Sequence, residues 1–156
     1  MDRHREIIRR ATAKHSFCTL ATASAANRPL VTGVLYAAAG DLLYVSTLET
    51  SAKVRNIREN DRVAVCIPVR RFPIGPPFTV QFQGTATICP IDEPEIVSQL
   101  EAGRLKRITS HGELEDPSAC LLRITPGPRI ASYGLGVPLR QLLRDPLRGS
   151  RSVRTG

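Results

Sequence analysis

The sequence contains no tryptophan, and aromatic residues make up only 4% of its 156 residues. Proteins that hold single-stranded nucleic acid stack its bases on aromatic side chains, so this scarcity argues against a nucleic-acid partner. The chain also lacks any run of about 20 apolar residues, the length that a membrane-spanning helix needs. Its first residues, Met1 to Glu6, lack the apolar segment of a secretory signal. We therefore expect a cytoplasmic protein with no membrane partner.

The four cysteines are not grouped in the sequence. Cys18, Cys66, Cys89 and Cys120 lie far apart, and each falls within an apolar run. A zinc site, in contrast, is built from ligands that lie a few residues apart, as in Cys-x-x-Cys. We therefore predict no metal site, and we interpret the cysteines as small buried apolar residues.

Positive charge is concentrated at the two ends of the chain. The net charge is +8, and residues 1–20 carry five basic against two acidic side chains, while residues 137–156 carry five arginines against one aspartate. The length corresponds to one domain, which we assign to residues 1–136, followed by a basic extension over 137–156 that is expected to be partly disordered. Such an extension attracts anionic ligands from a distance. Nucleic-acid binding by the basic ends is the weaker alternative.

Short strands dominate the predicted secondary structure. Segments that alternate apolar and polar residues, or that are rich in β-branched residues, occupy 16–23, 30–38, 42–47, 62–67, 78–89, 119–125 and 129–133. Helical periodicity occupies 2–14, 51–60, a segment beginning at Asp92, and the short stretch 139–144. This pattern predicts a mainly β protein, a barrel of six to seven mostly antiparallel strands with peripheral helices.

Glycine and proline mark where these strands turn or bend. The short turns between the first three strands predict an antiparallel meander, and residues 68–77, with four prolines, predict a stiff loop. Pro126-Gly127-Pro128 predicts a tight turn between the last two strands. Gly84, inside a long strand, predicts a β-bulge or a close approach of two backbones.

Hydroxyl groups and one lysine cluster where the third strand meets the next helix. Ser46 and Thr47 end the strand, Thr50 and Ser51 lie in the turn, and Lys53 falls in the first turn of the helix. A helix N-terminus presents free N–H groups and a positive dipole end, which favour an anion. The segment is therefore a candidate site for a phosphate monoester. An ordinary capped helix with a solvated lysine is the alternative reading.

The order of these segments resembles the pyridoxamine 5′-phosphate oxidase-like family. The matching segments are Thr19–Thr22, Asn27–Val31, Leu43–Thr47, Ser51–Val63 and Gln83–Ala86, and Ile130–Leu135 looks like the closing strand of actinobacterial members. The resemblance implies the FMN-binding split barrel, an antiparallel barrel that holds its cofactor at the interface of a homodimer. FMN is the implied cofactor, and the closing strand makes coenzyme F420 the alternative.

The same resemblance assigns residues to the cofactor. It implies that the flavin phosphate lies against Ser46, Thr47, Ser51 and Lys53, the hydroxyl cluster just described. It also implies that the backbone of Leu30, Val31 and Thr32 bonds the edge of the flavin ring, and that the partner subunit contributes Gln81 or Gln83.

Two departures from the oxidase pattern separate this chain from vitamin B6 oxidation. Ala52 occupies the position before the lysine, where the oxidase has arginine, and the oxidase's C-terminal Arg-Leu-Ala-Pro ending is missing. The resemblance thus implies an oxidoreductase that transfers a hydride between FMN or F420 and a small organic substrate, with no catalytic residue assigned. A non-catalytic carrier or sensor that binds flavin, F420 or haem is the alternative.

Overall fold

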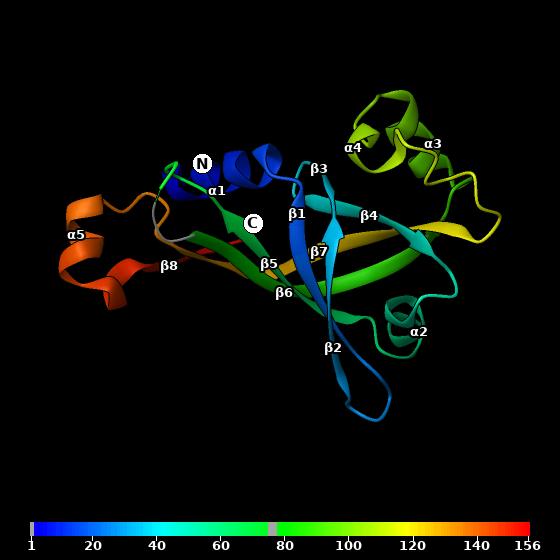
Figure 1. Ribbon diagram of the computed structural model, residues 1–156, viewed down its shortest axis with the longest axis horizontal. Coiled ribbons are helices and arrows are strands. Elements are labelled where there is room, and N and C mark those ends of the chain that lie inside the picture. Colours follow the sequence, from blue (N-terminus) through cyan, green and yellow to red (C-terminus); the bar gives the residue numbers. More distant parts are fainter. Residues whose placement is uncertain (1, 75–77) are drawn as a thin grey trace.

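In the described part of the chain, eight strands form a single curled antiparallel sheet, and five α-helices and one 3₁₀ helix lie around it (Figure 1). The computed structural model describes residues 2–74 and 78–156. The strands are β1 (Phe17–Ala23), β2 (Pro29–Leu35), β3 (Ala37–Ala39), β4 (Leu42–Leu48), β5 (Arg62–Val69), β6 (Phe78–Pro90), β7 (Ala119–Tyr133) and β8 (Ser150–Arg154). The helices are α1 (Arg3–Lys14), α2 (Ala52–Glu59), α3 (Pro94–Glu101), α4 (Lys106–Thr109), α5 (Leu139–Arg144) and the 3₁₀ helix η1 (Pro146–Gly149). The predicted fold class, a mainly β split barrel with peripheral helices, is confirmed.

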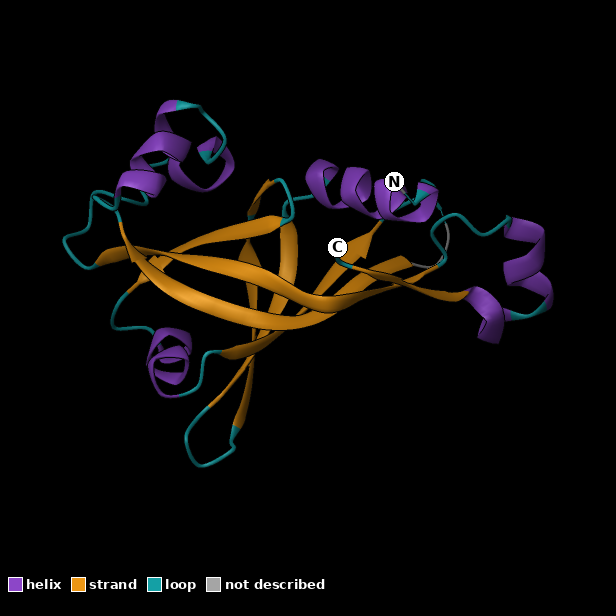
Figure 2. Cartoon of the chain, turned by 180° about the vertical axis from the view of Figure 1, so that it is seen from behind, coloured by secondary structure: helices purple, strands orange, loops and turns teal. Residues whose placement is uncertain are grey.

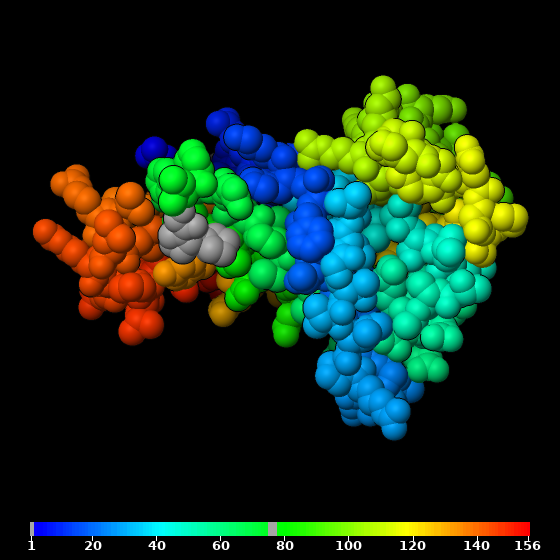
Figure 3. Space-filling model, in the orientation of Figure 1, coloured from blue at the N-terminus to red at the C-terminus, as the bar shows by residue number. Residues whose placement is uncertain are grey.

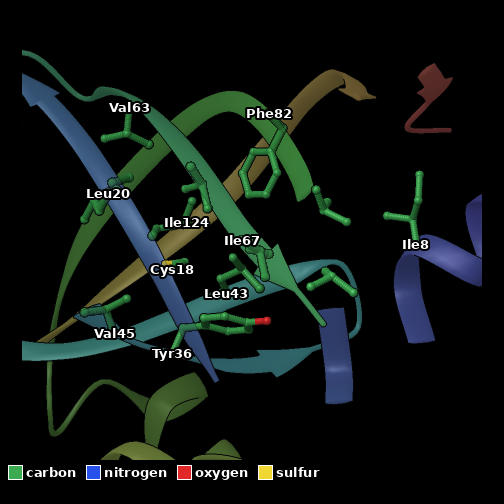
Figure 4. Packing of buried hydrophobic residues seen from close by; sticks show 14 of the residues in the cluster. Ile8, Cys18, Leu20, Tyr36, Leu43, Val45, Val63, Ile67, Phe82 and Ile124 are labelled. Atoms are coloured by element: carbon green, nitrogen blue, oxygen red, sulfur yellow. The ribbon is translucent and has the colours of Figure 1, made fainter. Parts of the chain in front are cut away.

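The sheet order is β2-β1-β5-β6-β7-β4-β3, with β8 added alongside β7. Side chains alternate between the two faces of each strand, and on the concave face the apolar ones form the main core. Figure 4 shows Cys18 and Leu20 of β1, Ile67 of β5 and Ile124 of β7 meeting in this core. No helix among the described residues covers the opposite, outer face of β1, β2, β5 and β6 (Figure 2).

The helices lie at the edges and ends of the sheet. Helix α1 contacts β3 and β5 and inserts Ile8 into the main core, while α3 and α4 cover a second cluster that includes Tyr44, Ile96 and Leu105. Figure 2 shows α5 at the end of the sheet opposite α3 and α4. No helix in the described part of the chain is long and apolar enough to span a membrane.

The predicted meander of the first three strands is wrong. Strands β1 and β2 form a hairpin, but the expected strand over 30–38 is interrupted at Tyr36, and β3 and β4 lie at the far end of the sheet, where β4 pairs with β7. Tyr36 is fully buried at the crossing point, where its N–H donates to the carbonyl of Ser16 and its hydroxyl donates to the carbonyl of Thr12 at 2.7 Å. These bonds fix the chain where it leaves one edge of the sheet for the other.

Replacing Tyr36 with phenylalanine removes the second of these hydrogen bonds and leaves the Thr12 carbonyl without it. We expect the free energy of unfolding to fall by about 1 kcal/mol, the typical net contribution of such a bond. Urea denaturation followed by circular dichroism measures this loss. An unchanged midpoint would show that the hydroxyl contributes nothing to fixing the crossing point.

Two proline-rich segments also differ from expectation. Pro68 lies inside β5, opposite Thr79 of β6, so the proline-rich loop begins at Arg70 and not at Pro68. The part of the loop prediction that concerns Gly75 to Pro77 lies outside the described residues. Pro126-Gly127-Pro128 is not a turn but part of a continuous β7. The pairing of β5 with β1 ends at Cys66, before Pro68, so the N–H that proline lacks is not needed in that ladder.

Gly84 explains how β7 continues through its prolines. The pairing of β6 with β7 shifts register between Phe82 and Gly84, and Gly84 lies opposite Pro126. A Cβ atom on Gly84 would lie 2.2 Å from the carbonyl oxygen of Thr125. The bulge and the close backbone approach that the sequence predicts at Gly84 are both present.

The basic segment 137–156 is part of the fold. It contains α5, η1 and β8, and β8 pairs with residues 129–133 of β7. The Arg71 guanidinium donates to the carbonyls of Gly134 and Val137, which ties the segment's start to the loop after β5. This differs from the expected partly disordered extension, because β8 has a full ladder of backbone partners.

Cys18, Cys89 and Cys120 are buried, as the sequence predicts, whereas Cys66 is partly exposed on the outer face. Burial raises the pKa of the Cys66 thiol. The thiol is therefore protonated near neutral pH and is a weak nucleophile in that state.

His4 joins the start of α1 to the closing strands. Its Nε2 atom shares a hydrogen bond of 2.9 Å with the buried Ser132 hydroxyl, and its Nδ1 atom is buried without a hydrogen-bond partner among the described residues. Burial lowers the pKa of His4, and Arg151 lowers it further, against an opposing effect of Asp2. The folded protein therefore favours the neutral ring.

This arrangement predicts a pH-dependent stability. The folded pKa of His4 lies below the unfolded value of about 6.5. The stabilisation that comes from burying the neutral ring is therefore complete above the unfolded pKa, and it is lost as the pH falls from there through the folded pKa. We expect the melting temperature of the His4→Gln variant to fall less between pH 8 and pH 5 than that of the parent protein. The exposed His111, changed to Gln, is the control. Identical pH profiles for the parent and His4→Gln would contradict this role.

Candidate functional site

Thr47 and Ser51 form a hydroxyl cluster where β4 leads into α2. Ser46 does not join it, because side chains alternate along β4 and Ser46 points to the same side as Tyr44, opposite to Thr47. The Thr47 hydroxyl donates to the Ser51 hydroxyl at 3.2 Å, and Ser51 in turn accepts from the Val54 N–H at 3.4 Å. Ser51 is therefore the N-cap of α2, as the alternative reading of the sequence has it. The preceding N–H groups, those of Ala52 and Lys53, have no intrahelical acceptor and can bind an anion.

Lys53 adds positive charge to this cluster. Its side chain is half-buried, and no carboxylate among residues 2–74 and 78–156 lies within 4.0 Å of its ammonium group. The nearby Glu49 pairs instead with Arg58, at 3.9 Å. With no acidic residue in the first turn of α2, the cluster combines hydroxyl donors, a dipole end and a free ammonium group.

Helix α2 is fixed in position by β1 and the hairpin that follows it. The Asn56 side chain donates to the buried Thr22 hydroxyl at 3.0 Å, and Glu59 accepts from the Ala25 N–H at 3.1 Å. Figure 3 shows the β1–β2 hairpin projecting beside α2. The middle and the end of α2 are thus held against β1 and its hairpin.

The residues predicted to contact a flavin ring lie on β2, an edge strand of the sheet. In the described sheet β2 pairs only with β1, so its other backbone edge is free, and β2 contacts β4. Leu30 lies opposite Thr22 and Thr32 lies opposite Leu20, so both point toward the concave face, whereas Val31 is on the outer face and is 66% exposed. The free edge supplies the backbone donors and acceptors that the prediction requires.

A cavity of about 490 Å³ lies on the outer face of the sheet. The register places Val31, Ala21, Ala64 and Gln83 in one row across β2, β1, β5 and β6, and all four line the cavity. Gln81 lines it from the next row. One chain therefore brings Val31, Gln81 and Gln83 together without a partner.

The other lining residues are absent from the sequence prediction, among them Cys66, Arg129 and Ser152. Cys66 alternates with buried residues along β5, and this pattern could have placed it on the outer face. Ser152 belongs to β8, whose residues Ser150–Arg154 carry one apolar side chain and so give no strand signal.

The hydroxyl cluster does not line this cavity. The structure thus separates the predicted site into two parts within one chain: Thr47, Ser51 and Lys53 at the start of α2, and Val31, Gln81 and Gln83 on the outer face. Leu30 and Thr32 do not line the cavity either. The contribution of Gln81 or Gln83 from a partner subunit stays a prediction.

Several solved structures share this fold. The heme storage protein HutZ from Vibrio cholerae has a TM-score of 0.70 at 18% identity, covering 86% of this chain and 98% of that one. A heme binding protein from Mycobacterium smegmatis has a TM-score of 0.76 at 15% identity over 99% of this chain, which spans only 59% of that protein. A FAD-binding protein from Mesorhizobium loti has a TM-score of 0.63 at 20% identity, covering 79% of this chain and 87% of that one. At these identities the likeness establishes the fold alone.

Sequence comparison identifies the family of the chain, whereas the structural likeness establishes only its fold. No curated protein matches the chain. Residues 2–127, most of the chain, match the family model described as pyridoxamine 5′-phosphate oxidase. These residues include α1, the hydroxyl cluster at the start of α2, and β1 to β6 with the larger part of β7. The chain therefore belongs to the pyridoxamine 5′-phosphate oxidase family.

Proposed function

We propose that this protein is a flavin-dependent oxidoreductase that transfers a hydride between FMN and a small organic substrate, with coenzyme F420 as the alternative cofactor. The observation that carries the proposal is the cluster at the start of α2. There two hydroxyl groups, two backbone N–H groups without helical acceptors and an ammonium group without a carboxylate partner converge. This set of donors fits a phosphate group, which both cofactors contain.

The proposal gives each part of the site a task. Thr47, Ser51 and Lys53 hold the phosphate, and the free backbone edge of Leu30–Thr32 orients the ring by hydrogen bonds. When bound, the flavin supplies the redox chemistry, while the protein supplies orientation and the surrounding electrostatics. The cavity on the outer face, mostly apolar with amide, hydroxyl and guanidinium groups in its lining, receives the substrate.

A homodimer is part of the proposal. Phe17, Val31 and Leu35 share the outer face of β1 and β2 and are 47%, 66% and 55% exposed. A contiguous apolar stripe of this kind is typical of a protein interface. A second copy seated on it would cover the stripe and bring Gln81 or Gln83 of one subunit toward the hydroxyl cluster of the other, with two cofactors at the interface.

The absorbance and fluorescence of the purified protein, followed by titration with FMN and with F420, test this function. We expect saturable binding of one of the two, one molecule per subunit, and reduction of the bound cofactor by a nicotinamide or organic donor. A protein that binds neither cofactor would refute the proposal.

A non-catalytic binding protein is the second candidate, because two of the structures that share this fold are described as heme proteins. The histidines do not single out an axial ligand. His15 Nδ1 lies 2.7 Å from the Ala11 carbonyl oxygen, His4 bonds Ser132, and His111 is 85% exposed. A Soret band that saturates with added hemin, in a protein that binds no flavin, would favour this candidate over the first.

A further inference from the structure

Two arginines face each other directly on the outer face of the sheet. Arg129 of β7 is the register partner of Arg154 of β8, and the Cβ atoms of such cross-strand partners lie about 4.5–5.5 Å apart. Both side chains are exposed. Like charges in directly opposite positions destabilise a sheet, so this pair calls for a compensating negative charge.

No such charge is supplied by the described chain. Neither guanidinium has a carboxylate within 4.0 Å or a side-chain hydrogen bond among residues 2–74 and 78–156. Another pair of neighbouring arginines in this chain does have a carboxylate partner. Arg5 and Arg9, one helical turn apart on α1, share the carboxylate of Asp41 at 2.9 and 3.8 Å. The pair on β7 and β8 has no equivalent of Asp41.

The unpaired arginines stand at the rim of the outer-face cavity. Arg129 lines it, and Ser152, two residues before Arg154 and therefore on the same face, lines it as well. Ala131 lies opposite both Gln81 and Ser152, which places Arg129 on the side of Gln83. No acidic residue lines the cavity in the described part of the chain, and most of its surface is apolar.

We infer that Arg129 and Arg154 form an anion subsite, which holds the carboxylate or phosphate of an organic ligand whose apolar body occupies the cavity. Guanidinium groups bind both kinds of anion through paired N–H donors, and Gln83 can donate a further amide N–H. That this ligand is the substrate rests on the function proposed above. The anion subsite itself does not depend on flavin binding.

Three probes with one apolar body separate the charge from the hydrophobic contact: 2-naphthoate, 2-naphthyl phosphate and neutral 2-naphthol. We expect the better of the two anions to bind the parent protein at least 10-fold more tightly than 2-naphthol, as measured by fluorescence titration. That difference corresponds to about 1.4 kcal/mol. Comparison of the two anions shows whether carboxylate or phosphate is preferred.

The double variant Arg129→Gln/Arg154→Gln tests the residues. It should bind both anions no more tightly than 2-naphthol, while Arg140→Gln/Arg144→Gln, which removes two exposed arginines of α5 that do not line the cavity, should behave as the parent does. The melting temperature of Arg129→Gln/Arg154→Gln should not be lower than the parent's, because a like-charge pair has been removed. Equal affinity of the parent for the anions and 2-naphthol, or undiminished anion binding by the variant, would overturn the inference.

FMN titration of the same proteins distinguishes this inference from the proposed function. The variant should bind FMN as the parent does if the two sites are separate as described. Anion binding in a parent protein that binds neither FMN nor F420 would support the subsite and refute the proposed cofactor. Flavin binding without any preference for the anionic probes would support the proposed cofactor and refute the anion subsite.

Discussion

Replacing Lys53 with alanine and Ser51 with aspartate in one chain should lower the affinity for FMN by about 100-fold. Hydrogen bonds to charged groups contribute about 1.5–3 kcal/mol each, and about 1.4 kcal/mol corresponds to a factor of ten. The variant loses the ammonium group and one hydroxyl and adds a carboxylate where the phosphate would lie. Isothermal titration calorimetry measures the change.

Aspartate at position 51 separates binding from folding. Ser51 caps α2, and aspartate is as good an N-cap as serine, so the helix should remain intact. The matched control is Ser98→Asp/Lys106→Ala, which makes the same change in charge at exposed positions on α3 and α4. If both variants bind FMN as the parent does, the phosphate does not lie at the start of α2.

Replacing Gly84 with alanine should lower the free energy of unfolding by about 3 kcal/mol, the upper part of the range for overpacking. The added Cβ would lie 2.2 Å from the Thr125 carbonyl oxygen, which belongs to the backbone of the paired strand and cannot rotate away. The bulge that carries β7 through Pro126 and Pro128 would have to open.

Gly40→Ala is the comparison for this variant. Gly40 has φ +65°, and the nearest atom to an added Cβ is the flexible Arg9 side chain at 3.9 Å. The left-handed conformation alone should cost about 1 kcal/mol. Urea denaturation of the two variants therefore separates backbone contact from backbone strain, and equal losses would show that the contact at Gly84 is relieved at little cost.

Local features of this fold could be predicted from the sequence, whereas its long-range pairing could not. The N-cap at Ser51, the bulge at Gly84 and the first helix each depend on residues a few positions apart. The pairing of β4 with β7, in contrast, joins Val45 to Leu122. Both are ordinary strand residues, and nothing in either segment specifies its partner.

The C-terminal strand shows a second limit. In Ser150–Arg154 only Val153 is buried, and the exposed arginines give the segment the composition of a solvated basic tail. Its strand structure comes from the free edge of β7, which supplies backbone partners whatever the side chains are. The placement of Arg154 opposite Arg129 therefore appears only in the structure.

The two parts of the candidate site differ in the same way. Thr47, Ser51 and Lys53 are close in sequence, and their cluster could be recognised before the fold was known. Val31, Gln83 and Arg129 belong to three strands and meet only because the sheet is built in this order.

Comparing the affinities of the parent protein for FMN and for riboflavin tests the phosphate assignment most directly, because the two ligands differ only in the phosphate. If the cluster at the start of α2 grips that group, FMN should bind about 100-fold more tightly than riboflavin, in line with two charge-assisted hydrogen bonds. Equal affinities for the two ligands, or no binding of either FMN or F420, would contradict the account.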